Sequence, residues 1–239
     1  MSINKKLITA VAAVVVIVGA IVFISLETAG GTFDVIANKS VQSFGKVLAA
    51  MPDKVSQGSE EGSWVLTAPD DSTRFHLGSG SDENARYDVM LQTDLSPFIL
   101  AGLDTSKLPD HYDVSDDLLT VGVKLEKKLA GSADESALSV YKRLVDNDRS
   151  MVNYHTEMDH FGVKLGDGNM FEWAKNLEMN ASMGENQDKD IVFVLNPEPL
   201  IEAGVDPEKV EGWMYLSVPV MENGKKMEVY KLLKPFNIQ

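Results

Sequence analysis

The sequence predicts an α+β fold in which one N-terminal transmembrane helix precedes two tandem repeats, each an amphipathic helix packed on an antiparallel sheet of about four or five strands. Three observations lead to this prediction: an apolar run near the N-terminus, an order of helix and strand patterns that occurs twice, and a short segment that recurs at a constant offset. The predicted boundaries are 1–30 for a membrane anchor or uncleaved signal segment, 31–128 for the first repeat and 129–239 for the second.

The N-terminal run from Leu7 to Leu26 is uncharged and follows Lys5 and Lys6. Twenty mostly apolar residues at about 1.5 Å rise match a hydrocarbon core of roughly 30 Å. The paired lysines favour the cytoplasmic side, which places the chain from about Glu27 onward outside the membrane. We therefore expect the protein to contact the membrane through residues 7–26. Secretion after signal cleavage is the alternative, since a cut after Gly30 is chemically acceptable.

The first repeat opens with apolar residues at three- and four-residue steps from Thr32 toward Pro52, the pattern of an amphipathic helix. Alternating residues on either side of a turn at 69–72 predict a hairpin over 62–77. Further strand patterns follow at 87–92 and 118–125.

The second repeat shows the same order. Ser132 and Glu135 have capping-box spacing ahead of a helical pattern. A hairpin pattern turns at 166–169, a strand begins near Asp190, and a final hairpin turns at 222–224.

The recurring segment reads P-x-I-x-A-G-x-D-x-x-K and begins at Pro97 and again at Pro199, an offset of 102 residues. A proline can open a short helical turn and a glycine can end it with a left-handed residue. The following aspartate can cap the next turn, and the apolar pairs Phe98/Ile99 and Leu200/Ile201 are expected to point inward. We favour this structural interpretation over a ligand-binding loop that occurs twice.

The composition excludes several classes of functional site and partner. The absence of cysteine excludes disulfides, thiolate nucleophiles and cysteine-ligated metal centres. The net charge of −14 argues against a nucleic-acid partner. Without the two N-terminal lysines, 20 basic and 36 acidic residues remain, so the exported part carries −16. This charge fits a solvated acidic surface; a site for a cation or a basic partner is the alternative.

Five residues are weak candidates for a metal site. Asp146 and Asp148 have calcium-loop spacing with Ser150 and Glu157, but Met151 stands where that loop needs glycine. In an extended segment, His155, Glu157 and Asp159 would share one strand face and could hold a metal. A polar lead-in to the strand at Phe161 is the commoner reason for such residues.

Ser43 and Ser139 each begin an S-x-x-K motif, the spacing used by penicillin-recognising enzymes, but the accompanying K-T-G is absent. We expect both serines to face solvent on the outer sides of their helices.

The sequence therefore predicts a membrane-anchored, extracytoplasmic, non-enzymatic binding protein without cofactors, whose partner is an extracytoplasmic protein or a small-molecule ligand. A metal-dependent hydrolase or cation-binding domain that uses the His155–His160 region is one alternative. A structural component of the cell envelope is the other.

Overall fold

The computed structural model describes residues 30–78, 86–129, 131–155, 160–175, 191–222 and 225–237. It is an α+β structure with two six-stranded antiparallel sheets and few helices. None of the helices in these ranges is long and apolar enough to cross a bilayer. The predicted span at residues 7–26 lies outside the described residues.

The first sheet has the strand order β1-β2-β3-β4-β6-β5. It is preceded by α2 and a 3-10 turn, and a short helix and a second 3-10 turn separate β4 from β5. The elements are α2 (Gly30–Ala50), η2 (Pro52–Lys54), β1 (Val55–Gln57), β2 (Trp64–Thr67), β3 (Thr73–Leu77), β4 (Val89–Asp94), α3 (Ser96–Leu100), η3 (Thr105–Lys107), β5 (Tyr112–Ser115) and β6 (Leu118–Val123).

The second sheet has the order β11-β12-β10-β9-β8-β7, and its elements follow one another along the chain in the same sequence as those of the first. They are α4 (Ala137–Asn147), η4 (Arg149–Met151), β7 (Val152–His155), β8 (His160–Lys164), β9 (Met170–Ala174), β10 (Ile191–Leu195), α5 (Glu198–Glu202), η6 (Pro207–Lys209), β11 (Met214–Glu222) and β12 (Lys225–Phe236). The repeated order predicted from the sequence is therefore present in the described residues.

The prediction of about four or five strands per sheet is wrong, because each sheet has six. The strands without a clear sequence signal are β1, β5 and β7, which have three or four residues each. β1 and β7 are sheet-edge strands, and so is β5. Such short edge strands bury few side chains, so they lack the apolar alternation that identifies a central strand.

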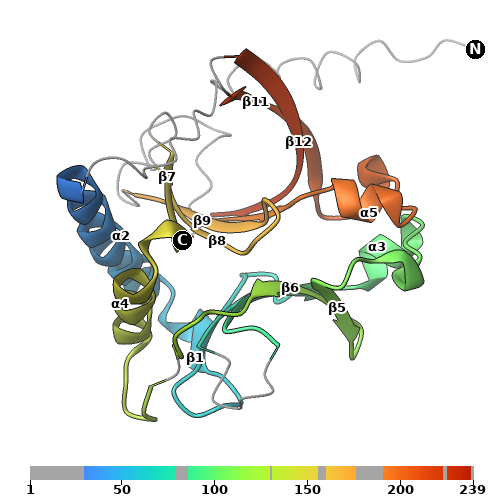
Figure 1. Ribbon diagram of the computed structural model, residues 1–239. Coiled ribbons are helices and arrows are strands. Elements are labelled where there is room, and N and C mark those ends of the chain that lie inside the picture. Colours follow the sequence, from blue (N-terminus) through green and yellow to red (C-terminus); the bar gives the residue numbers. More distant parts are fainter. Residues whose placement is uncertain are drawn as a thin grey trace, which may run out of the picture.

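The helices α2 and α4 lie side by side at one side of the two sheets (Figure 1). α2 contacts β7 of the second sheet and α4 contacts β3 of the first. We expected each helix to pack on the sheet of its own repeat; each helix does contact that sheet and also contacts the sheet of the other repeat. The reason is that Phe44 of α2 packs between Tyr141 of α4 and Trp173 of β9, with ring centroids 4.3 and 5.3 Å away.

The two sheets share one apolar core. Phe75 of β3 stacks on Phe171 of β9 with ring centroids 4.3 Å apart and an interplanar angle of 9°. One continuous cluster of buried side chains runs from α2 through both sheets. Aromatic contacts of this kind add to the hydrophobic gain of burial, so separating the repeats would expose large apolar surface.

The N-terminus of α4 differs from the predicted capping box. Ser136 is the N-cap residue, and its hydroxyl accepts a hydrogen bond from the Ser139 backbone N–H. Glu135 instead forms an ion pair with Arg143, which also donates to the Leu129 carbonyl. The cap therefore begins four residues after Ser132, and the glutamate ties the helix to the preceding loop.

Ser43 is buried in this core, so the prediction that it faces solvent is wrong. Its hydroxyl accepts a hydrogen bond from Trp173 Nε1 at 3.1 Å and donates one to the Lys175 carbonyl at 3.0 Å. Lys46, the lysine of the motif, is exposed. The serine therefore satisfies a buried indole N–H, which is a structural role.

We expect Ser43→Ala to lower the free energy of unfolding by about 1–3 kcal/mol, because the buried Trp173 N–H loses its acceptor. Ser139→Ala is the matched control, since Ser139 begins the other S-x-x-K motif but is exposed. Its effect should stay within about 0.5 kcal/mol. Urea unfolding followed by tryptophan fluorescence measures both; equal losses would contradict the role assigned to Ser43.

Candidate functional site

The predicted metal candidates are not brought together in the described residues. Asp146 lies on α4 and pairs with Lys142 at 2.5 Å. Asp148 caps η4 by accepting hydrogen bonds from the Ser150 backbone N–H and hydroxyl. Both carboxylates thus have local structural partners.

The structure describes little of the other three candidates. His155 is the last residue of β7, and nothing is described of its side chain. Glu157 and Asp159 lie outside the described residues. Within the ranges that the structure covers, no three His, Asp or Glu side chains are grouped as metal ligands.

His160, which ends the predicted His155–His160 region, belongs to a different group on the outer face of the second sheet. This outer charged group consists of His160 on β8, Glu172 on β9 and Lys231 on β12, all buried. Gly162 lies opposite Glu172 across the β8–β9 pair, and a Cβ there would come within 3.1 Å of the Glu172 Cγ. The glycine makes room for the carboxylate.

Burial favours the neutral forms of Glu172 and Lys231. It raises the pKa of Glu172 to about 7, against the opposing attraction of His160 and Lys231. Burial also lowers the pKa of Lys231, although Glu172, Asp167 and Glu198 oppose the shift. Because Lys231 provides a positive charge beside the carboxylate, the group is poorly suited to hold a cation.

Sequence reasoning missed Glu172 and Lys231. Glu172 stands between Phe171 and Trp173, so simple alternation places it on the face away from the core, where charge is normally solvated. The structure buries both faces of β9 and β10, whereas β3 and β4 of the first sheet alternate between buried and half-buried residues. The continuous apolar run of β10 is a local signal of a strand buried on both faces, but nothing within β9 itself distinguishes Glu172 from a solvated residue.

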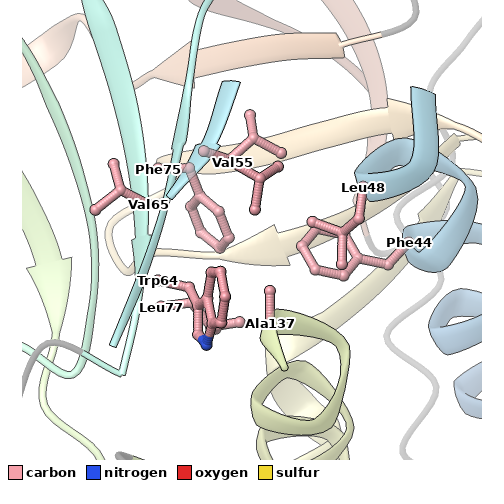
Figure 2. Close-up of a pocket in the computed structure, with 9 residues that line it drawn as sticks. Phe44, Leu48, Val55, Trp64, Val65, Phe75, Leu77 and Ala137 are labelled. Atoms are coloured by element: carbon pink, nitrogen blue, oxygen red, sulfur yellow. The ribbon is translucent and has the colours of Figure 1, made fainter. Parts of the chain in front are cut away.

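An apolar hollow lies between the helices and the first sheet. Figure 2 shows Phe44 and Leu48 of α2 facing Phe75 and Val55 of the sheet, with Ala137 of α4 beside them. Its cavity volume is about 10 Å³, room for about one water molecule. The indole N–H of Trp64 at its edge donates to the Glu135 carbonyl. The hollow is smaller than the roughly 300–1,000 Å³ of typical ligand sites and lacks converging polar groups.

The recurring segments meet at the opposite end of the molecule, where α3 and α5 lie side by side (Figure 1). The Asp104 N–H donates to the Ala203 carbonyl at 2.8 Å, and the Asp206 N–H donates to the Ala101 carbonyl at the same distance. Asp104 corresponds to Asp206 and Ala101 to Ala203 at the offset of 102 residues, so the two hydrogen bonds are equivalent and form a reciprocal pair across a local twofold axis. The segment joins the two repeats.

The local features predicted for this segment are present. Prolines stand in the first turn of α3 and of α5, and Gly102 and Gly204 have φ of +107° and +102°. The side chains of Asp104 and Asp206 accept hydrogen bonds from the backbone two residues later. Ion pairs to Lys107 and Lys209 add to these bonds. The hydrogen bonds and the paired lysines lower the pKa of both carboxyls.

In each of the two apolar pairs, only the first residue points inward as expected. Phe98 and Leu200 are fully buried, but Ile99 and Ile201 are 44% and 41% exposed, and Leu100 is 78% exposed. We call the surface formed by Ile99, Leu100 and Ile201 the α3–α5 face. These three apolar residues belong to a junction whose backbone is held by hydrogen bonds between the two segments.

No protein-family model, no curated protein and no solved structure matches this chain.

Proposed function

We propose that this chain is a membrane-anchored, extracytoplasmic, non-enzymatic interaction protein that binds a protein partner through the α3–α5 face. The anchor is the apolar run at residues 7–26, and the tandem α+β repeats would lie outside the membrane. The observation that carries the proposal is the exposed apolar trio Ile99, Leu100 and Ile201 on the junction between the repeats.

The rigidity of this junction supports binding. The reciprocal backbone hydrogen bonds and the buried anchors Phe98 and Leu200 hold α3 and α5 in place before any partner arrives. A preorganised surface loses less conformational entropy on binding than a flexible one. The apolar residues are thus presented at little entropic cost.

The position of the face is also favourable. α2, which follows the predicted anchor, lies on the other side of the sheets from α3 and α5 (Figure 1). The face is therefore directed away from the element that connects to the membrane. A partner outside the cell could reach it without displacing α2.

Site-specific photo-cross-linking of the full chain in its native membrane tests the proposal. A photoreactive residue at position 100 should give a discrete cross-linked product, and Ile201→Asp in the same chain should reduce its yield at least fivefold. The same residue at position 35 is the control, because Val35 is 51% exposed on α2. A product at position 35 but none at position 100 would refute the proposed contact surface.

A further inference from the structure

We infer that the partner of the α3–α5 face is a protein segment that combines apolar and basic side chains; this inference rests on the proposed function. The segments 96–107 and 198–209, which carry the face, contain five acidic residues and two lysines. The acids are Asp104, Glu198, Glu202, Asp206 and Glu208. Charge and apolar exposure thus occur together at one place.

The two lysines neutralise two of the five acids and leave three carboxylates. Lys107 is paired with Asp104 at 3.1 Å and Lys209 with Asp206 at 2.6 Å. Each of these ion pairs joins residues three positions apart within one turn. Glu198, Glu202 and Glu208 are exposed and add negative charge around the face.

The charge arrangement departs from the local twofold symmetry at one pair of equivalent positions, which gives the face a direction. Leu100, at the end of α3, corresponds to Glu202 at the end of α5, 102 residues later. Ile99 corresponds to Ile201 in the same way. The face therefore has a matched apolar pair at its centre, a leucine on one side and a carboxylate on the other. A segment with an apolar residue followed by a lysine or arginine complements this pattern.

The alternative occupants fit less well. A second copy of this chain would bring the same acidic residues against one another, and like charges in contact cost free energy. An anionic lipid surface would be repelled for the same reason. The net charge of −16 on the exported part would also attract a basic partner over long range, which raises the association rate.

Three hexapeptide probes test the inference with the full chain in nanodiscs of zwitterionic phosphatidylcholine, with empty nanodiscs as the blank. The first is Lys-Leu-Leu-Lys-Leu-Lys, the second replaces each lysine with glutamate, and the third replaces each leucine with serine. We expect the first to shift the methyl resonances of Ile99, Leu100 and Ile201 and to bind at least fivefold more tightly than the other two. Its affinity should fall as salt rises from about 50 to 500 mM.

A pair of charge reversals provides the matched control. Glu202→Lys should weaken binding of the basic probe at least threefold, whereas Glu126→Lys makes the same charge change at an exposed residue of another loop and should leave it unchanged. Equal binding of the lysine and glutamate probes, or equal effects of the two reversals, would overturn the inference. A cross-link from position 100 to a second copy of this chain would overturn it too.

The two proposals can fail separately. If position 100 cross-links to a partner but the basic probe has no preference, the contact surface stands and the basic partner is refuted. If position 100 gives no product, the proposed function itself fails.

Discussion

Replacing Gly102 with alanine should lower the free energy of unfolding by about 2–4 kcal/mol, which corresponds to a fall in Tm of about 5–15 °C. Two effects add. Gly102 has a φ of +107°, which L-residues with a Cβ rarely adopt, and a Cβ there would lie 2.7 Å from the Gly204 carbonyl oxygen. That carbonyl belongs to the other repeat, so relief of the clash must separate the two segments. Urea unfolding and thermal scans of the full chain in detergent micelles measure the loss.

Two other glycines separate the contributions. Gly212 also has a positive φ, +79°, but the nearest neighbour of a Cβ there would be the Lys234 Nζ at 3.6 Å. Gly212→Ala therefore introduces backbone strain without a clash and should lower the free energy of unfolding by about 1 kcal/mol. Gly45→Ala lies within α2 with ordinary contact to Leu138, so it should be neutral or stabilise by up to about 1 kcal/mol. A loss at Gly102 no larger than that at Gly212 would mean that the junction is not tightly packed.

Replacing Glu172 with glutamine should make the protein more stable at pH 8 by about 2–4 kcal/mol. In the folded chain the pKa of this carboxyl is raised to about 7, chiefly by burial, while the ordinary value is 4.5. The folded state therefore keeps a proton that the unfolded chain releases between these pH values. The contribution of this carboxyl to the stability of the native protein is therefore greatest below about pH 4.5, falls as the pH rises through 7, and levels off above it.

The variant lacks this titration, so its advantage over the native protein should vanish near pH 4.5 and grow toward pH 8. Urea unfolding at intervals of half a pH unit gives the difference between the two curves. Glu202→Gln on the exposed face of α5 is the control and should change stability by less than about 0.5 kcal/mol at every pH. A difference between native protein and Glu172→Gln that does not change with pH would show that the carboxyl is solvated.

The central part of the fold could be predicted because its signals are local. The hairpins around β2–β3 and β8–β9 alternate apolar and polar residues on either side of a turn, and the structure contains both pairs. The short strands β1, β5 and β7 could not be recognised, since pairing with a longer neighbour holds them in place and their own side chains carry little pattern.

The structural roles of two candidate residues, Asp148 and Ser43, were not predicted from the sequence. Asp148 was a weak candidate for a metal site, and its Oδ1 accepts hydrogen bonds from Ser150 two residues later, local bonds that compete with any ligand. Ser43 was expected at the surface, because a serine beside apolar residues on a helix gives no sign of a tryptophan 130 residues away.

By itself, the sequence determined the proline, glycine and aspartate positions of the recurring segment, and with them the turn that each copy forms, because φ preferences and caps depend on a few adjacent residues. Only the tertiary structure decided that the two copies bind each other through Ala101, Ala203, Asp104 and Asp206, that Leu100 remains exposed beside them, and that Glu172 is buried. Alternation indicates on which face of a strand a side chain lies, but what covers that face depends on contacts between residues far apart in the sequence.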